Sequence, residues 1–144
     1  MNPADDASYA KPLPVLDHLS TPFWEGCRAH ELRLQRCRAC GSLRFPAGPV
    51  CLKCRSAQTD WVAASGRGNV YSWIVVRHPV PADIYAAEVP YIVALVDLEE
   101  GVRMPTNLVD CEPEQVSAGM PVAVTFRAVT AAVTLPLFAP RAGR

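Results

Sequence analysis

Six cysteines occur among the 144 residues, and four of them form two CxxC pairs separated by ten residues. A CxxC pair on a tight turn, or knuckle, directs two sulfur atoms toward one point. Two such knuckles complete the tetrahedral shell that structural zinc takes from thiolates. Pro46 and Gly48-Pro49 break the intervening chain, which is long enough to form a short ribbon and return. The sequence therefore predicts a metal site with the ligands Cys37, Cys40, Cys51 and Cys54.

Two alternatives to zinc follow from the same cysteines. Two disulfides would need an oxidising compartment, but residues 1–9 carry Asp5 and Asp6 and lack the basic and apolar stretches of a secretory signal. We therefore expect a cytoplasmic protein with reduced thiols. Iron also accepts four sulfur ligands, so the spacing favours zinc without excluding iron. Because four cysteines close the coordination shell, we expect the metal to fold the ribbon rather than to catalyse a reaction.

Few other side chains have the spacing of a catalytic site. The sequence contains no GxSxG or HExxH motif, and the glycines at 66 and 68 lack the third glycine and the helix of a phosphate-binding loop. Cys27 and Cys111 lie outside the metal set, and His30 follows Cys27 by three residues. An enzyme built on Cys27 and His30 is one hypothesis. Buried, inert thiols are commoner, so we predict no catalytic residue and a non-catalytic module.

Charge is distributed unevenly along the chain, although its net charge is zero. Residues 28–67 carry eight basic and two acidic side chains, whereas the segments on either side are acidic. The cations around the ribbon either compensate the metal-bound thiolates or form a site for phosphates or an acidic partner. Nucleic acid is not the expected partner, because the aromatic residues that would stack on bases lie in the acidic C-terminal half.

The pattern before the cysteines predicts one short helix in a mainly β protein. Fourteen prolines disfavour long helices, and no apolar run approaches the ~18 residues of a membrane span. Thr21 suits an N-cap and Pro22 the first helical position, so we expect a helix from there to about His30. Phe23 and Trp24 either cover the core or offer a hydrophobic surface to another protein.

Strands are predicted on both sides of the knuckles. Residues 31–36 alternate polar and apolar side chains, as in a half-exposed strand that enters the first knuckle. After the second knuckle we expect a long strand at residues 61–77 that bends at glycines. A hairpin of residues 91–97 and 102–109 follows, then a helical turn at 110–114. Two final strands are expected at 121–129 and 133–138. Five such strands indicate a small barrel of OB type, although other all-β arrangements share the pattern.

These expectations divide the chain into four parts. An N-terminal tail and helical segment occupies residues 1–34, a zinc ribbon 35–58, a five-stranded OB-fold domain 59–140, and a tail 141–144. One domain or two small modules is all that a chain of this length supports.

The motifs together resemble one family from about Pro12 to Pro140. The shared motifs include FWE at 23–25, LRLQRC at 32–37, RFP at 44–46, GRG at 66–68, VPY at 89–91, TNLV at 106–109 and GMPV at 119–122. The chain is similar to the acyl-CoA-associated zinc-ribbon/OB-fold proteins, long catalogued only as a domain of unknown function, and this resemblance implies that the zinc ribbon is rubredoxin-like. Arg55 departs from the pattern, since glycine usually follows the second CxxC pair. Glycine eases a left-handed turn, so Arg55 is expected either to strain the knuckle or to use a different turn.

The resemblance implies an accessory subunit that docks onto a thiolase-like enzyme, such as a lipid-transfer-protein-type thiolase or aldolase, and helps to form its CoA channel. A hot-dog-fold hydratase is another partner that the resemblance implies, and acyl-CoA is a possible shared ligand. Five cations near the ribbon are candidates for the phosphates of CoA: Arg38, Arg44, Lys53, Arg55 and Arg67. The alternative hypothesis is a stand-alone acyl-CoA or lipid-chain binding protein with the barrel as its pocket, and single-stranded nucleic-acid binding is a weaker one.

Overall fold

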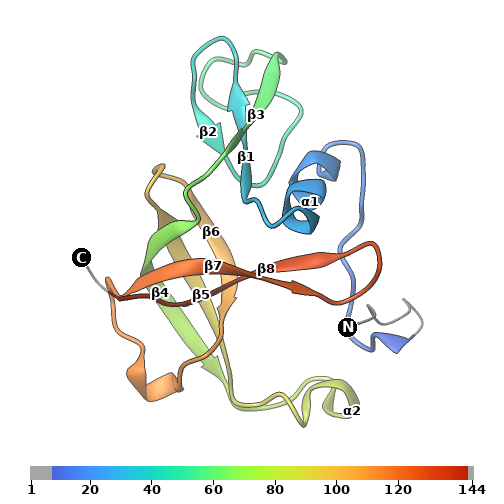
Figure 1. The fold of residues 1–144 in the computed structure, drawn as a ribbon, viewed down its shortest axis with the longest axis vertical. Helices are drawn as coiled ribbons and strands as arrows, with labels where there is room; N and C mark the ends of the chain where they lie inside the picture. The colour runs from blue at the N-terminus through green and yellow to red at the C-terminus, as the bar shows by residue number, and fades with distance from the viewer. Residues whose placement is uncertain (1–7, 143–144) are drawn as a thin grey trace.

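The computed structural model describes residues 8–142. Their helices and strands are, in chain order, α1 (Thr21–Arg28), β1 (Arg33–Cys37), β2 (Leu43–Arg44), β3 (Thr59–Ala63), β4 (Arg67–Val76), α2 (Ala82–Tyr85), β5 (Tyr91–Leu98), β6 (Arg103–Leu108), the 3-10 turn η2 (Pro113–Gln115), β7 (Pro121–Ala128) and β8 (Thr134–Pro140). Figure 1 shows the ribbon strands β1–β3 above a barrel, with α1 beside the junction and α2 at the far end.

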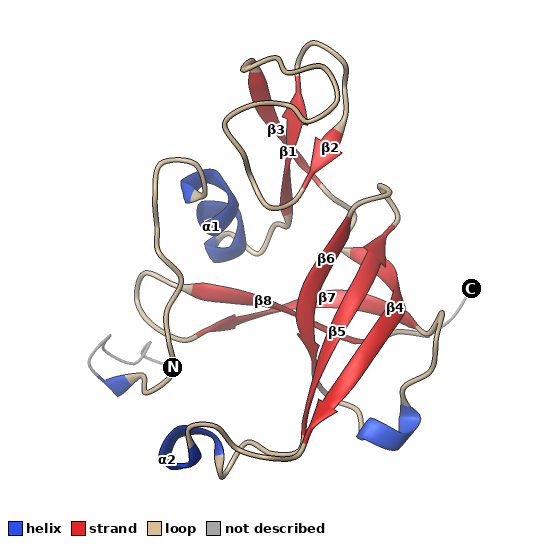
Figure 2. Ribbon diagram, turned by 180° about the vertical axis from the view of Figure 1, so that it is seen from behind, coloured by secondary structure: helices blue, strands red, loops and turns tan. Residues whose placement is uncertain are grey.

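The strands form two sheets, which are also visible from behind in Figure 2. The ribbon sheet has the order β2-β1-β3, and the closed barrel has the order β4-β5-β6-β8-β7. The neighbours in both sheets are antiparallel except β6 and β8, which meet in parallel at Leu108 and Phe138. The mainly β fold with a zinc-ribbon cysteine cluster and a five-stranded barrel is therefore confirmed.

The prediction of one long, bent strand from residue 61 to 77 is wrong. β3 ends at Ala63 and pairs along its length with β1, so residues 59–63 lie in the ribbon sheet. β4 begins at Arg67 in the barrel, after Gly66 turns the chain with a φ of 77°. The glycines thus separate two sheets, where the sequence pattern was interpreted as a bend within one strand.

The barrel closes around apolar side chains that alternate along its strands. β5 has every second residue buried, as expected for a strand with one face toward a core. The largest fully buried side chains in the barrel are Phe138, Met104, Val70, Val96 and Val122. The predicted hairpin and the two final strands are confirmed, with boundaries that differ by one or two residues.

Helix α1 joins the core of the ribbon to that of the barrel. Its buried residues Phe23 and Cys27 belong to the same cluster as Leu32 and Leu34 and the barrel core. Phe23 is 5% exposed and thus covers the core, whereas Trp24 is only partly buried. The helix begins at Thr21, not after it, because the Thr21 hydroxyl donates to the Asp17 carbonyl (2.6 Å) instead of capping.

The end of α1 and the short helix α2 differ from the predictions. α1 ends at Arg28, since His30 takes a left-handed φ of 58° and the Glu31 N–H donates to the Gly26 carbonyl (2.8 Å). α2 was not predicted. Within the described residues, no helix has the length and apolar content needed to cross a membrane.

Candidate functional site

The structure brings the sulfur atoms of Cys37, Cys40, Cys51 and Cys54 within 4.8 Å of one another. The Cys37–Cys54 sulfur distance is 3.5 Å, and the Cys40–Cys51 distance is 3.6 Å. Tetrahedral zinc with Zn–S bonds of about 2.3 Å requires S–S distances of about 3.8 Å. The four thiols therefore fit one zinc ion, and they leave no coordination position for a substrate.

The two knuckles have the same backbone hydrogen bonds. In the first, the Cys37 N–H donates to the Ser42 carbonyl (2.9 Å), and the Gly41 N–H donates to the Cys37 carbonyl (2.8 Å). In the second, the Cys51 N–H donates to the Ser56 carbonyl (2.9 Å), and the Arg55 N–H donates to the Cys51 carbonyl (2.8 Å). The residue after each CxxC pair is left-handed, with a φ of 77° at Gly41 and 64° at Arg55. Arg55 therefore adopts the usual knuckle turn and bears its strain.

Ser42 links the two knuckles beside the sulfur cluster. Its Oγ lies 3.3 Å from the sulfur atoms of both Cys40 and Cys51. The Lys53 N–H also points at the Cys51 sulfur (3.4 Å). The Ser42 hydroxyl, followed by the backbone N–H groups of Cys54 and Lys53, lowers the pKa of Cys51 to about 5. These donors stabilise the thiolate form in which cysteine binds a metal.

The five candidate CoA-binding cations fall into two groups. Arg44 is partly buried, and its guanidinium donates to Gln35 Oε1 and to the Gly48 carbonyl (3.1 Å for the latter). Arg67 forms an ion pair with Glu99 (3.0 Å). The remaining three are exposed and take part in none of the ion pairs found among the described residues: Arg38, Lys53 and Arg55.

Cys27 and His30 do not form a catalytic pair in this structure. Cys27 is fully buried, and burial raises the pKa of its thiol to about 12, so it is protonated at neutral pH. His30 lies beyond the helix and stacks on Phe126, with ring centroids 5.3 Å apart. Burial, followed by nearby Asp110 and Glu112, also raises the pKa of Cys111. Neither thiol has the lowered pKa of a nucleophilic cysteine.

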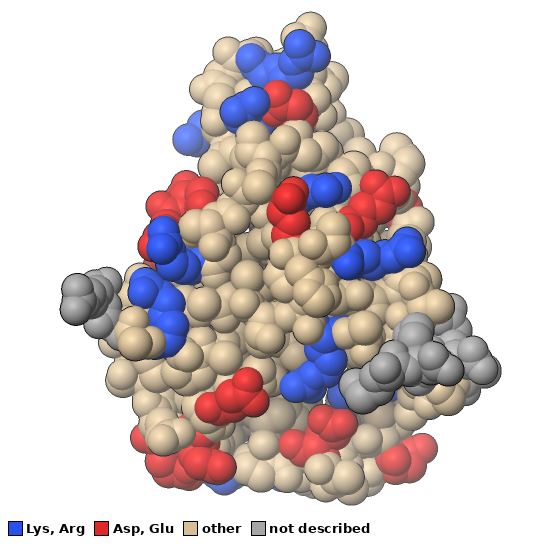
Figure 3. Space-filling model, in the orientation of Figure 1, with Lys and Arg blue, Asp and Glu red and all other residues tan. Residues whose placement is uncertain are grey.

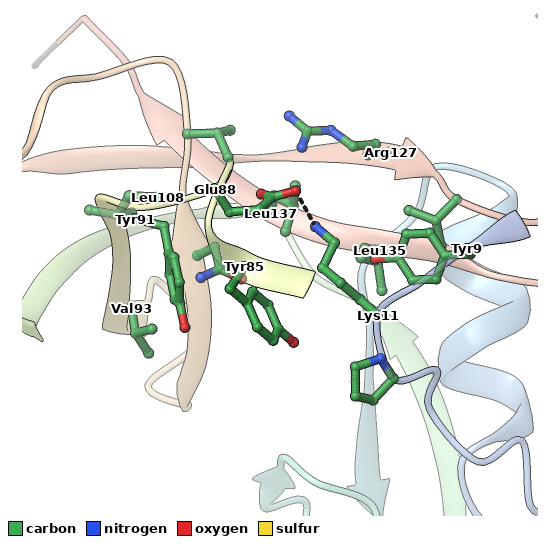
Figure 4. Close-up of a pocket in the computed structure, with 14 residues that line it drawn as sticks. Tyr9, Lys11, Tyr85, Glu88, Tyr91, Val93, Leu108, Arg127, Leu135 and Leu137 are labelled. Carbon is green, nitrogen blue, oxygen red and sulfur yellow. Dashed lines mark hydrogen bonds and ion pairs between the residues drawn. The ribbon is translucent and has the colours of Figure 1, made fainter. Parts of the chain in front are cut away.

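A pocket of about 420 Å³ opens on the barrel beside α2 (Figure 4). Three tyrosines contribute to its walls, namely Tyr9, Tyr85 and Tyr91, and Leu135 and Leu137 form part of its apolar lining. The Lys11–Glu88 ion pair (3.2 Å) spans the N-terminal segment and the α2 loop, and Arg127 also lines the pocket. Its volume lies within the ~300–1,000 Å³ typical of small-ligand sites. Because its walls come from five separate segments, no local pattern in the sequence indicates it.

Two family models match consecutive parts of the chain. Residues 24–60 match "ChsH2, rubredoxin-like zinc ribbon domain", and residues 61–127 match "ChsH2, C-terminal OB-fold domain". A solved structure described as "Ltp2-ChsH2(DUF35) aldolase" superposes with a TM-score of 0.80 at 43% identity, and the match covers 89% of this chain and 98% of that chain. The chain belongs to the ChsH2/DUF35 family. The resemblance seen in the sequence motifs is thereby confirmed.

The curated relatives of the chain carry two kinds of description. A "DUF35 domain-containing scaffold protein" of Methanothermobacter thermautotrophicus is 35% identical over 69% of this chain and 74% of its own length. A "Probable enoyl-CoA hydratase alpha subunit" of Thermomonospora curvata is 42% identical over 90% of this chain. The chain spans only 40% of the length of that hydratase subunit. Relatives of this ChsH2/DUF35 chain thus include a scaffold protein and a subunit of an acyl-CoA enzyme.

Proposed function

We propose that this DUF35 protein is a non-catalytic accessory subunit that docks onto a thiolase-like enzyme, such as a lipid-transfer-protein-type thiolase or aldolase, acting on acyl-CoA thioesters. It supports that enzyme and helps to form its CoA channel. The observation that carries the proposal is the likeness, along nearly the whole chain, to the DUF35 component of an aldolase. A hot-dog-fold hydratase is a further partner, in keeping with the hydratase subunit among the relatives.

The chemistry of the cysteines supports a role without catalysis. A shell of four thiolates holds zinc in a closed site, where it can fold the ribbon but cannot bind a substrate. Among residues 8–142, the two remaining thiols both have a raised pKa. The zinc-loaded ribbon would therefore serve as a rigid surface, and its partner would supply the reactive groups.

Anion binding is the contribution expected from the ribbon. Arg38, Lys53 and Arg55 are exposed cations that form no ion pair within residues 8–142, so they can face an anion of the complex. Arg44 and Arg67 are weaker candidates for CoA phosphates, because both guanidinium groups already have partners.

Co-expression tests the accessory role. Each thiolase-like enzyme of the same genome is produced with and without the tagged chain, and its solubility, retention on the tag and turnover of acyl-CoA are measured. We expect one enzyme to be retained and to gain solubility or activity. An enzyme that is equally soluble and active alone, and that is never retained, would refute the proposal.

The barrel pocket favours a second candidate function, in which the isolated chain binds an acyl-CoA or a lipid chain. Tyrosine rings and leucines offer an apolar wall, and Arg127 offers a cation near it, while Lys11 is already paired with Glu88 (Figure 4). Calorimetry with an acyl-CoA on the isolated chain measures this directly. Micromolar binding that is lost in Leu135→Trp, which fills the pocket, supports the second candidate. The absence of binding to the folded, zinc-loaded chain eliminates it.

A further inference from the structure

Leu52 is the most exposed large apolar side chain among the described residues, at 90% exposure. It lies between Cys51 and Cys54, in the turn that two backbone hydrogen bonds close and that zinc would fix. Val50, at 42% exposure, precedes the same knuckle. An apolar side chain held on a rigid turn loses little conformational freedom when another molecule covers it.

The sequence around Leu52 contributes only basic charges, and the nearest acidic residue along the chain is Asp60. Asp60 forms an ion pair with Arg36, and its pKa is lowered by Arg36 and, less strongly, by Arg38. From Cys37 to Gln58 the sequence contains no Asp or Glu. Arg38, Lys53 and Arg55 are exposed there without a recorded ion pair, whereas six other basic side chains in the described part of the chain are paired with carboxylates. Figure 3 shows several Lys and Arg groups toward the end of the ribbon, with one acidic group beside them.

Compensation of the metal site explains only part of this surface. Zinc with four thiolates carries a charge of about −2, which nearby cations offset. That requirement gives no reason for an exposed leucine. The equivalent position of the first knuckle holds Arg38, so the fold itself does not demand an apolar residue there.

We infer that Leu52, Val50, Arg38, Lys53 and Arg55 form a docking surface, here termed the knuckle tip, whose occupant is a protein with an apolar pocket bordered by carboxylates. The inference rests on the proposed function and assigns that pocket to the thiolase-like enzyme. Leu52 fills the pocket, and the three cations face the acidic border. A protein is favoured over a lipid surface because the tip presents one fully exposed apolar side chain, whereas membrane-surface segments bury a broad apolar face.

Binding kinetics of the full-length, zinc-loaded chain separate the two contributions. The probe is the thiolase-like enzyme that wild-type chain retains in the co-expression experiment. Leu52→Ser should weaken binding by about ten-fold or more, mainly through faster dissociation, with Leu52→Ala giving a smaller loss. The double variant Arg38→Gln/Lys53→Gln should slow association and flatten its dependence on salt.

Two matched controls lie at the opposite end of the molecule (Figure 1). Val80→Ser removes an apolar side chain of 70% exposure from the loop between β4 and α2. Arg77→Gln removes an exposed cation next to the end of β4. Both should bind the enzyme like wild type, and zinc content should stay at one ion per chain in every variant.

Each result decides the inference. If zinc-loaded Leu52→Ser and Leu52→Ala bind the enzyme as wild type does, the knuckle tip is not the docking surface, while the proposed function stands because the wild type still binds. If the double variant changes only the KM for acyl-CoA, the cations face CoA phosphates instead. Leu52-dependent binding to phosphatidylserine vesicles, with no effect on the enzyme, would overturn the protein partner. If the wild-type chain retains no enzyme, both proposals fail.

Discussion

The ribbon of this protein has three short strands around four sulfur atoms, whereas the barrel has five strands around a packed apolar core. β2 of the ribbon contains two residues, and within the three ribbon strands Leu34 is the one fully buried aliphatic side chain, while Leu43, Trp61 and Val62 are only partly buried. A small sheet of this kind needs the folding free energy of metal binding, because it buries too little apolar surface to be stable by packing alone. The comparison indicates that the ribbon depends on its ligands and the barrel on its packing.

Loss of the metal should have the largest effect. Cys54→Ser removes one exposed ligand, and structural zinc sites contribute on the order of 10 kcal/mol to folding. We expect zinc to be lost and the amide NMR signals of the ribbon strands to collapse, while barrel signals stay dispersed. Cys111→Ser is the matched control and should keep one zinc per chain. Ribbon signals that stay dispersed in metal-free Cys54→Ser would show that the ribbon does not need its metal.

Loss of barrel packing should be the next largest effect and should spare the metal. Phe138 is fully buried, so Phe138→Ala should lower the free energy of unfolding by about 3–5 kcal/mol. Urea denaturation measures the loss, and metal analysis of the folded variant should still give one zinc per chain. If zinc content falls in proportion to the lost stability, metal binding by the ribbon depends on packing in the barrel.

Within the ribbon, the two knuckles should respond in opposite directions to changes at their left-handed residues. Arg55→Gly removes the strain of a side chain at a φ of 64° and should raise the free energy of unfolding by about 1 kcal/mol. Gly41→Ala adds such strain at a φ of 77°, where a Cβ has free space around it, and should lower stability by about 1–2 kcal/mol.

Gly48→Ala is the control for both changes in thermal unfolding of the zinc-loaded protein. Gly48 has no positive φ, and a Cβ there meets only ordinary contacts at 3.8 Å, so the substitution should be nearly neutral. Destabilisation by Arg55→Gly would indicate that the Arg55 side chain makes a contribution larger than its backbone strain.

The smallest effect should come from acid titration of the barrel surface. The Arg103 guanidinium donates to Asp97 (2.6 Å) and lowers the pKa of that carboxyl group. The ion pair therefore adds stability above the unfolded pKa of about 3.9, and this contribution is lost as the pH falls through the lower folded pKa. NMR titration should show a higher Asp97 pKa in Arg103→Gln. An unchanged Asp97 pKa would show that Arg103 is not the cause of its lowering. The ribbon should differ, because acid also protonates its thiolates and releases metal.

The elements predicted correctly from the sequence are those with a local signal. The CxxC spacing predicts that the four cysteine sulfur atoms cluster, and the apolar run at residues 91–97, followed by a return at 102–109, predicts the β5–β6 hairpin. β3 was placed in the wrong sheet, because its pairing with β1 depends on residues more than twenty positions away. The pocket could not be predicted, since Tyr9, Tyr91 and Arg127 meet only after the barrel closes. The exposure of Leu52 likewise follows from how the knuckle turns, not from its neighbours in the sequence.

Titration of the zinc-loaded chain into its thiolase-like partner tests the non-catalytic accessory role itself. Turnover of an acyl-CoA substrate is measured for the chain alone, for the partner alone and across the titration. We expect no turnover by the chain alone, and partner activity that rises and saturates at a fixed ratio of subunits. Turnover by the chain alone, or partner activity that is high and unaffected at every ratio, would contradict it.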